Sequence, residues 1–396
     1  MRVLFVAHAF PRHERDLPGN FVLRLAEALA GEGVEVTALA PAAAGLAGHE
    51  ELHGVKVRRY RYATRRAETL AYGGRMHLSA ASPLGALTTA GLLAAGALEA
   101  RRLGRAADLV HAHWWVPGGL QALAARSRRR PLVTTLHGTD VRLARRSAAA
   151  RAVCARVLRA SAVVTAVSGW LRDEAAAIAP DVAERIRVAP MPVDEDTFGP
   201  PPDGAGRGNE LLFVGRLDVQ KGLADAIRAL PMLTGAAAGS APPRLRVVGD
   251  GPERAELAGL AGRLGVADRI TWEGQLPLAE LAERYRRAAV LVVPARDEGL
   301  GLVAVEAQLC GTPVVAAASG GLLDVVTDGR TGRTFPPGEP AELARALVAL
   351  LEDPVGAAEL AARARPAALA RFGRRAAAKA YAEVYAEALQ RVPSRR

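Results

Sequence analysis

Cysteine and aromatic residues are scarce in this chain of 396 residues. The two cysteines, Cys154 and Cys310, are too few for a disulfide framework or a four-ligand zinc site. Aromatic residues make up 4% of the sequence, and the basic first half has no strand that matches the aromatic-and-basic RNP motif of an RNA-binding sheet. No signal peptide is predicted, because the chain begins directly with a strand-like run. These absences favour a cytoplasmic protein.

The chain also lacks an apolar run long enough to span a bilayer. The longest one, Leu84–Leu98, is shorter than the roughly 20 residues that a spanning helix needs, and it contains two threonines and three glycines. No transmembrane helix is therefore expected. A hydrophobic fraction of 50% over this length instead predicts about two domains with large cores.

Acidic residues are in deficit only in the first half of the chain. Residues 1–193 carry 27 Lys and Arg against 15 Asp and Glu, whereas residues 194–396 carry 25 against 26. Arginines cluster at positions 58–66, 101–105 and 126–130. Such clusters are often solvated surface charge, and the alternative is an anionic partner. As that partner we favour an anionic lipid at a membrane face or an acidic glycan, and we expect no nucleic acid.

Strand-like and helix-like segments alternate along the chain, as in α/β proteins with doubly wound parallel sheets. Strands are predicted at residues 2–8, 34–40, 55–60, 109–112, 132–136 and 162–166, and a helix at 20–30. A segment rich in proline, glycine and acidic residues at 189–210 marks a domain boundary, after which the pattern restarts at 211–214. A final helix is predicted at 374–390, with Tyr381, Val384, Tyr385 and Leu389 along one face.

The stretch from residue 290 to 317 predicts a strand, a loop, a helix and a second strand. The apolar run Val290–Val293 ends at Pro294, and a helix is expected over residues 300–309. Glu298 falls in the loop and Glu306 about two turns into the helix, so both carboxylates can face one crevice at the carboxyl end of the strand. In the alternative interpretation, Glu298 is a solvated residue favoured by the helix dipole and Glu306 lies on the surface.

The loop between the two glutamates places backbone N–H groups at a helix start. Gly299, Leu300 and Gly301 lie there, and such N–H groups together with the helix dipole suit a phosphate. Glu306 has apolar neighbours on nearly every side, so its carboxylate needs a partner, and a ribose diol can donate two hydroxyls to it. An anion site flanked by two carboxylates indicates a sugar nucleotide.

Two glutamates separated by seven residues and followed by Gly-Thr-Pro-Val-Val resemble the signature of the retaining glycosyltransferases of family 4. The resemblance extends over nearly the whole chain. It implies the GT-B fold, in which two Rossmann-like, doubly wound parallel-sheet domains face each other across a cleft. Residues 1–193 would then bind the acceptor, residues 194–372 would bind the nucleotide sugar, and the helix within 373–396 would cross back to the first domain.

Arg216 and Lys221 stand five residues apart in a strand-to-helix loop, where they can converge on one anion unless they are a solvated pair. The resemblance implies that they hold the donor diphosphate. It further implies that Glu298 holds sugar hydroxyls and that Glu306 holds the ribose.

Histidines and glycines at other strand ends complete the candidate set. His137 follows a strand directly, and although a lone histidine is usually structural, the resemblance implies that it faces the reacting sugar. Gly19 matches the first glycine of a Gly-Gly turn near the donor phosphates, but Asn20 replaces the second, so an ordinary loop glycine is an equal alternative. His111 and His113 can share one face of a strand, but no third ligand is evident, so no metal site is expected.

Two further glycine-rich turns follow predicted strands in the second half. Gly249 and Gly251 have the spacing of the first two glycines of a dinucleotide-binding motif, but Arg254 occupies the third position, so that motif is rejected. The turn Ser319-Gly320-Gly321 matches a backbone-exposing turn of the resembled family near the donor.

The resemblance implies an enzyme that moves a hexose-type sugar, with retention, from a UDP-, GDP- or ADP-sugar to a hydroxyl of a lipid-linked, polysaccharide or small-molecule acceptor. The leaving phosphate would take the proton of the acceptor. No metal and no other cofactor is expected, because the cations stabilise the departing diphosphate. The alternatives are a sugar-nucleotide epimerase of the same architecture and a non-catalytic nucleotide-sugar-binding scaffold. Peripheral contact with the inner face of the cell membrane through the basic domain is also expected.

Overall fold

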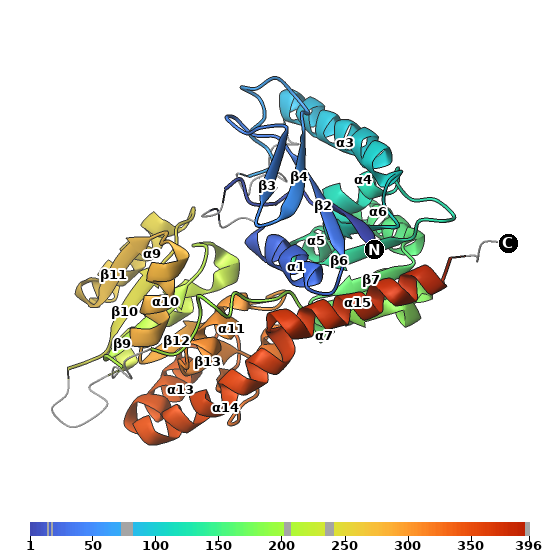
Figure 1. Ribbon diagram of the computed structural model, residues 1–396. Helices are drawn as coiled ribbons and strands as arrows, with labels where there is room; N and C mark the ends of the chain where they lie inside the picture. Colours follow the sequence, from blue (N-terminus) through green and yellow to red (C-terminus); the bar gives the residue numbers. More distant parts are fainter. Residues whose placement is uncertain (14–15, 17–18, 73–81, 202–206, 234–240, 393–396) are drawn as a thin grey trace. The chain divides into compact units, whose positions relative to one another are not determined.

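The computed structural model describes residues 1–13, 16, 19–72, 82–201, 207–233 and 241–392 (Figure 1). The chain divides into two compact units. Unit 1 comprises Met1–Pro192 and Arg374–Arg396, and unit 2 comprises Val193–Gly373. The first division falls between Pro192 and Val193, inside the proline-rich segment, and each unit is built on a sheet that is wholly or mainly parallel.

Unit 1 has an eight-stranded sheet with the order β3-β4-β2-β1-β5-β6-β7-β8. The β3–β4 pair is antiparallel and the other pairs are parallel. The order changes direction between β1 and β5, which makes the carboxyl ends of these strands the place where such sheets bind ligands. The strands are β1 (Arg2–Val6), β2 (Glu35–Pro41), β3 (His49–Leu52), β4 (Val55–Tyr60), β5 (Leu109–His113), β6 (Leu132–Leu136), β7 (Val163–Ala166) and β8 (Ile186–Val188).

Helices of unit 1 pack on this sheet through their apolar faces. In α1, for example, Val22, Leu25 and Leu29 are buried at helical spacing. The helical segments are α1 (Asn20–Ala30), α3 (Pro83–Gly104), the π-turn η1 (Trp114–Gly119), α4 (Leu120–Ala122), α5 (Thr139–Arg145), α6 (Ala148–Ala160), α7 (Gly169–Ile178), the 3-10 turn η2 (Pro180–Arg185) and α15 (Arg374–Gln390). Within the described ranges, no helix combines the length and the apolar character needed to cross a membrane.

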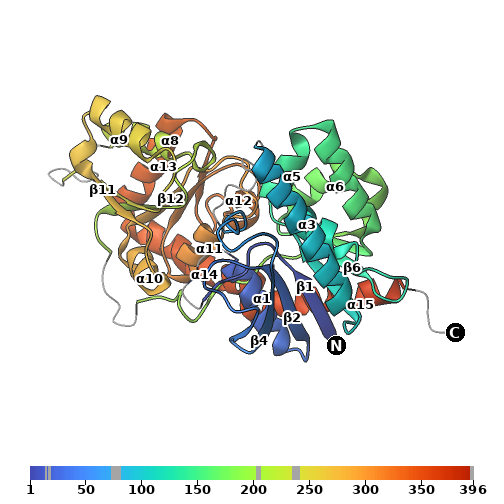
Figure 2. The same ribbon diagram turned by 90° about the horizontal axis from the view of Figure 1, so that it is seen from above.

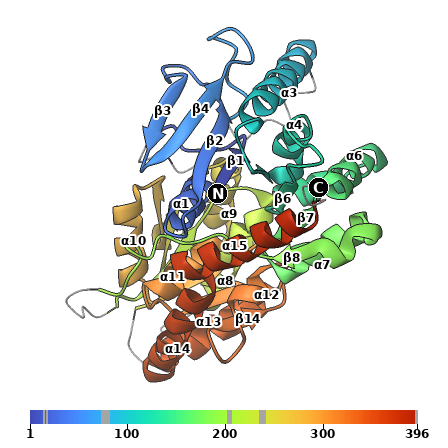
Figure 3. The same ribbon diagram turned by 45° about the vertical axis from the view of Figure 1, so that its right-hand side comes forward.

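The last helix, α15, packs within unit 1 although it follows unit 2 in the sequence. It contacts α1 and runs past β6 and β7 (Figure 3). Tyr381 and Tyr385 are fully buried, and the Tyr381 hydroxyl donates to the Ala189 carbonyl at 3.0 Å. Leu389, predicted on the buried face, is 37% exposed, and Ala388 is buried instead. The buried face therefore follows the ordinary helical spacing of residues 381, 384, 385 and 388, and Leu389 lies at its margin.

Unit 2 has a six-stranded, fully parallel sheet with the order β11-β10-β9-β12-β13-β14. This is the doubly wound order, and its direction changes between β9 and β12. The strands are β9 (Glu210–Val214), β10 (Arg244–Val248), β11 (Ile270–Gly274), β12 (Val290–Val293), β13 (Val314–Ala317) and β14 (Arg333–Phe335). β12 and β13 are buried along their whole length, as expected of parallel strands covered on both faces.

The helical segments of unit 2 up to α12 connect successive strands, α13 and α14 follow β14, and α11 contacts both α10 and α14 (Figure 2). The helical segments are η3 (Val219–Lys221), α8 (Leu223–Ala229), η4 (Leu230–Met232), α9 (Arg254–Arg263), η5 (Ala267–Arg269), α10 (Leu278–Arg287), α11 (Leu302–Leu309), α12 (Leu322–Val325), α13 (Pro340–Glu352) and α14 (Pro354–Phe372).

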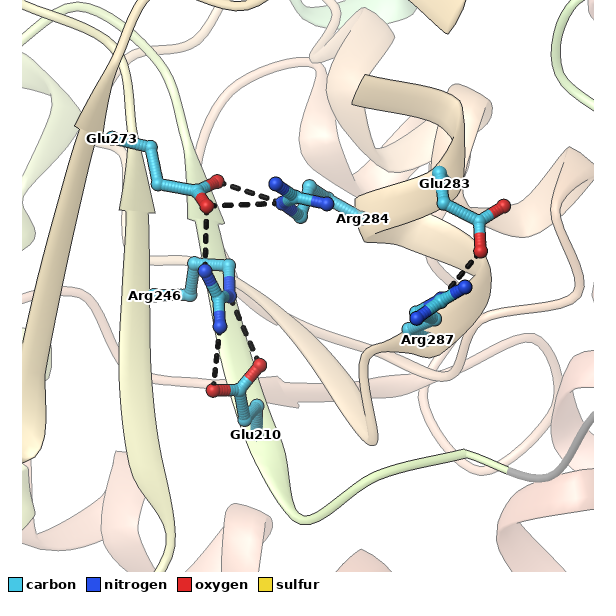
Figure 4. A network of polar contacts seen from close by, with 6 residues as sticks. All are labelled: Glu210, Arg246, Glu273, Glu283, Arg284 and Arg287. Carbon is cyan, nitrogen blue, oxygen red and sulfur yellow. Dashed lines mark hydrogen bonds and ion pairs between the residues drawn. The ribbon is translucent and has the colours of Figure 1, made fainter. Parts of the chain in front are cut away.

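An ion-pair network ties three neighbouring strands of unit 2 to α10 (Figure 4). Arg246 on β10 binds both carboxylate oxygens of Glu210 on β9, at 2.9 and 2.8 Å, and reaches Glu273 on β11 at 2.5 Å. Glu273 also accepts from Arg284 of α10 at 2.8 Å. Glu210, Arg246 and Arg284 line a small pocket there, and because these charges satisfy one another we assign the network to stability.

Candidate functional site

Three loops of unit 2 meet at the carboxyl ends of the adjacent strands β9, β12 and β13. The loop after β12 is joined to the loop after β9, because the Arg296 N–H donates to the Gln220 carbonyl at 2.8 Å. It is joined to the loop after β13 because the Gly321 N–H donates to the Glu298 carbonyl, also at 2.8 Å. The predicted residues of this unit, except Glu306 on the helix that follows, therefore lie on connected loops at the point where the strand order reverses.

Glycines allow these loops to approach one another closely. Gly222 has a positive φ of 68°, and a Cβ there would collide with the Pro294 carbonyl oxygen. Gly320, at a φ of 60°, would collide in the same way with the Glu298 carbonyl oxygen. A residue with a side chain would push the loops apart, so these glycines fix the spacing of the backbones that carry the candidate residues.

Lys221 and Glu298 form an ion pair between the first two loops. The Lys221 ammonium lies 2.6 Å from a Glu298 carboxylate oxygen, and both side chains are partly exposed. Arg216 lies in the same β9 loop as Lys221, with its guanidinium 3.7 Å from the Asp218 carboxylate. Lys221 of the predicted diphosphate pair thus contacts Glu298, the predicted sugar-binding carboxylate, which the sequence spacing alone does not show.

The start of α11 lies between the two predicted glutamates. The helix begins at Leu302, with Gly301 as its N-cap at a φ of 92° and without a side chain capping it. The first backbone N–H groups of any helix have no partner within the helix. Gly299, Leu300 and Gly301 lead directly into this start, so the loop can present N–H groups and the positive end of the helix dipole to an anion.

Glu306 lies on α11, is half buried, and contacts Tyr285 of α10. The Tyr285 hydroxyl donates to a Glu306 carboxylate oxygen at 2.8 Å. Burial raises the pKa of Glu306 to about 7, the bond from Tyr285 opposes that shift, and the charge of Asp194 adds to it. A carboxyl group whose pKa lies near 7 can take up or release a proton when a ligand binds near that pH.

The rejected dinucleotide motif has a packing explanation. Gly249 has a φ of 132°, and a Cβ there would collide with the Gly215 carbonyl oxygen. A Cβ on Gly251 would collide with the backbone of Leu217. The two glycines allow the loop after β10 to pack on the loop after β9.

In unit 1, His137 follows β6 and is held by a turn that Asp140 organises. The Asp140 carboxylate accepts from the N–H groups of His137 at 3.1 Å, Gly138 at 2.9 Å and Trp115 at 3.3 Å. Gly138 has a φ of 113°, which favours glycine. Burial raises the pKa of Asp140, and the backbone N–H bonds oppose this shift.

The ring of His137 belongs to a cluster of histidine and aromatic side chains. Its Nε2 lies 3.2 Å from Nδ1 of His113, and its ring lies 4.3 Å from that of Trp114. His111 bridges the Tyr385 hydroxyl at 2.8 Å and the Thr135 hydroxyl at 2.6 Å. Burial is the main cause that lowers the pKa of all three histidines, so the rings are neutral near pH 7.

The structure places His111 and His113 side by side, with ring centroids 4.3 Å apart. Both are buried, and their neighbouring rings agree with the expectation that they share one face of a strand. Among the described residues, no group of three or more His, Cys, Asp or Glu side chains is placed to hold a metal ion.

Gly19 is required by the backbone around it. It has a φ of 78°, caps α1, and would place a Cβ against the Ala9 carbonyl. The close approach to Ala9 accounts for the glycine without any ligand, and a phosphate-binding role for Gly19 stays a prediction.

Many of the clustered arginines of unit 1 are structural. Arg59 is buried and binds Glu50, the Tyr72 hydroxyl and the Pro11 carbonyl. Arg61 pairs with Glu68, and Arg130 donates to the carbonyls of Ala107 and Ala125. The two ion pairs offset part of the charge of the first cluster, and the bonds of Arg130 occupy N–H donors that would otherwise be available to an anionic partner.

Comparison with known proteins decides the family. The model described as "Glycosyl transferases group 1" matches residues 201–371, and "Glycosyltransferase Family 4" matches residues 18–197. A D-inositol 3-phosphate glycosyltransferase of Xylanimonas cellulosilytica is 39% identical over 335 residues, covering 78% of each chain. The chain belongs to glycosyltransferase family 4. An enzyme of the same name from Thermobispora bispora is 36% identical over 72% of each chain.

Solved structures place this family 4 glycosyltransferase in the GT-B fold class. The sucrose-phosphate synthase of Thermosynechococcus elongatus matches it with a TM-score of 0.78 and 25% identity, over 98% of each chain. HepE of Anabaena, in complex with UDP-glucose, matches with a TM-score of 0.72 and 21% identity, over 98% of this chain and 99% of that chain. The predicted family and the two Rossmann-like parallel-sheet domains are confirmed.

Two residues of this glycosyltransferase that hold candidate groups in place were missed from the sequence. Asp140 follows the His-Gly pair at the start of a helix, where an aspartate often caps backbone N–H groups, and this position could have indicated its role. Tyr285 has no such signal. Its contact with Glu306 depends on the packing of α10 against α11.

Proposed function

We propose that this family 4 glycosyltransferase transfers a hexose-type sugar, with retention of anomeric configuration, from a nucleoside-diphosphate sugar to a hydroxyl group of an acceptor. The observation that carries the proposal is the meeting of Lys221, Glu298 and the start of α11 at the strand reversal of unit 2. Positive groups suited to a diphosphate stand there beside a carboxylate suited to sugar hydroxyls.

In this proposal the donor diphosphate binds to Arg216, Lys221 and the N–H groups at residues 299–301. Lys221 would exchange its contact with Glu298 for the phosphate, which frees Glu298 to accept from sugar hydroxyls. Glu306 would accept from the ribose diol, and the raised pKa means that ribose binding favours its ionised form. The HepE complex with UDP-glucose, in a protein of the same fold, supports a nucleotide-sugar donor.

The chemical step is the exchange of one bond at the anomeric carbon. The bond from this carbon to the diphosphate oxygen breaks, and a bond to the acceptor oxygen forms on the same face. The leaving phosphate oxygen takes the acceptor proton, so no side chain has to act as a base. Stabilisation of the diphosphate by fixed cations and N–H groups lowers the barrier. We therefore propose that transfer needs no metal, and activity that persists in a chelator would support this.

His137 of unit 1 would contact the reacting sugar as a neutral hydrogen-bonding group. Its pKa, lowered mainly by burial, keeps it neutral, and Asp140 fixes the backbone on which it stands. The neutral ring can donate from one nitrogen and accept at the other.

We propose an anionic acceptor. The relatives are named for D-inositol 3-phosphate, which carries a phosphate, and unit 1 contains the basic excess of the chain. A lipid-linked acceptor at the inner face of the cell membrane is the second form of this proposal. This second form predicts that the enzyme acts on the cytoplasmic side of membranes rich in acidic lipid. It also predicts that binding of the protein to such membranes weakens as the salt concentration rises.

The test is a panel of UDP-, GDP- and ADP-sugars followed by thermal unfolding. At roughly 100-fold above its dissociation constant, the correct donor should add about 2.7 kcal/mol to the free energy of unfolding. That donor is then incubated with and without a phosphorylated acceptor, and the anomeric configuration of the product is read by NMR. An epimer formed without acceptor would indicate an epimerase, donor binding without any turnover would indicate a scaffold, and an inverted product would refute retention.

A further inference from the structure

A pocket of about 450 Å³ opens at one end of the strands of unit 1, and His137 follows the other end. Its lining includes Leu132 at the start of β6, Ala162 just before β7 and Arg185 just before β8, so it lies at the amino ends of these strands. His137 follows the carboxyl end of β6, and five strand residues separate the two edges by roughly 16 Å. The volume falls within the range of small-molecule sites.

The lining of this pocket is strongly cationic. Five of its residues are arginines, none of the described lining residues is acidic, and the arginines come from four separate segments of unit 1. They are Arg126 and Arg128 after α4, Arg159 in α6, Arg185 in η2 and Arg391 after α15. Like charges that are brought together from distant parts of a chain repel one another, so their convergence calls for a compensating anion.

Three of the five arginines are held in place by contacts with neighbouring groups. Arg159 forms a two-point contact with Asp181 at 2.9 and 3.0 Å. Arg391 binds Glu387 at 2.8 Å, a carboxylate that it shares with Arg187.

The third of these, Arg185, donates to the Ser161 carbonyl at 2.9 Å. This bond uses one nitrogen of a guanidinium that offers five N–H donors. The contacts of Arg159, Arg185 and Arg391 therefore orient their guanidinium groups, and the remaining N–H donors are available to a ligand.

Arg126 and Arg128 complete the pocket from an exposed turn. Within the described part of the chain, neither has an acidic partner or a side-chain hydrogen bond. Their neighbour Arg129 is equally exposed on the same turn but does not line the pocket.

We propose that this pocket is a second anion-binding site, which takes a ligand carrying phosphate groups. Guanidinium groups bind phosphate through paired N–H donors, and several arginines around one cavity suit a ligand with more than one anionic oxygen group. The ligand reaches the site as a free phosphorylated compound or as the headgroup of an acidic lipid. The site shares no residue with the proposed donor site, so it does not depend on the proposed function.

Inorganic pyrophosphate, measured by isothermal titration calorimetry, tests the soluble source. Arg126→Gln combined with Arg128→Gln should weaken binding roughly tenfold or more, since two charge-assisted contacts are lost. Arg129→Gln is the matched control and should stay within about twofold of the wild type. Pyrophosphate that binds the donor site does so equally in the wild type, the double variant and Arg129→Gln. A difference in pyrophosphate affinity between these proteins therefore reports on the pocket. Arg130 is left unchanged, because its bonds to backbone carbonyls make it part of the fold.

Co-sedimentation with phosphatidylcholine vesicles, with and without phosphatidic acid, tests the lipid source. Loss of pyrophosphate binding alone in the double variant identifies a soluble ligand, and loss of binding to acidic vesicles as well identifies a headgroup. Replacing both arginines by lysine should give intermediate affinity, because charge remains and the planar fork is lost. The proposal is overturned if the double variant binds both probes as the wild type and Arg129→Gln do.

Discussion

Replacing Glu306 by glutamine should remove a fall in stability that the wild-type protein shows as the pH rises. Burial raises the pKa of Glu306 to about 7 from an ordinary value of 4.5. Between these two values the folded protein binds more protons than the unfolded chain does. The stability contributed by the protonated group is therefore complete below the unfolded pKa and is lost as the pH rises through the folded pKa.

The size of the effect follows from the pKa difference. Each pKa unit corresponds to about 1.4 kcal/mol, so the free energy of unfolding should fall by about 3.5 kcal/mol at most between roughly pH 4.5 and pH 7. Urea unfolding across this interval measures the fall. Glu306→Gln should flatten the curve, whereas Glu280→Gln, at an exposed position on α10, should leave it as in the wild type. Parallel curves for the wild type and Glu306→Gln would refute the assignment.

The same group should couple donor binding to pH. If the ionised carboxylate accepts from a ribose diol, the donor binds the ionised form, and its affinity should fall about tenfold per unit below roughly pH 7. Glu306→Gln should bind the donor weakly at every pH and without this slope. A normal donor affinity in Glu306→Gln would instead make Glu306 a structural residue, paired with Tyr285.

Three further changes test the loops and the sheet. Lys221→Ala should weaken donor binding by about 1.5–3 kcal/mol in calorimetry, and a change within twofold would exclude Lys221 from the diphosphate site. Asp140→Ala should lower the free energy of unfolding by about 1–3 kcal/mol, because three backbone N–H groups lose their acceptor, and Asp140→Asn should recover part of it. Arg246→Ala should cost about 1–3 kcal/mol in urea unfolding without changing donor affinity, since Glu210 loses its ion pair with Arg246 and Glu273 keeps only its ion pair with Arg284.

Most of the secondary structure was predictable because its signals are local. The helices at 20–30 and 374–390 and the strands at 55–60 and 132–136 have the predicted bounds. Each combines a clear apolar period with a turn or glycine at its end. The edge strand β3, with the sequence His-Glu-Glu-Leu, was missed. An edge strand with polar side chains has no apolar alternation to reveal it.

The candidate residues were predictable one by one, but their contacts were not. Lys221 and Glu298 are 77 residues apart and meet because β9 and β12 are neighbours in the sheet. Two other strands, β10 and β11, lie between them in the sequence, and no local pattern states which strands pair. Glu306 was recognised as a carboxylate that needs a partner, but its hydroxyl donor, Tyr285, comes from another helix.

The glycines of unit 2 show why a single motif is weak evidence for this site. Gly249 and Gly251 have the spacing of a dinucleotide motif, but they are needed where the loop after β10 packs against the loop after β9. Gly222 and Gly320 allow close contact between neighbouring loops in the same way. Since each loop rests on the backbone of the next, the position of Lys221 depends on residues after β12 as much as on its own loop. A phosphate-binding glycine and a packing glycine have the same sequence signal, and only the backbone contact separates them. The arrangement of Arg216, Lys221, Glu298 and the start of α11 is therefore stronger support for the donor site than any one of the motifs that contain them.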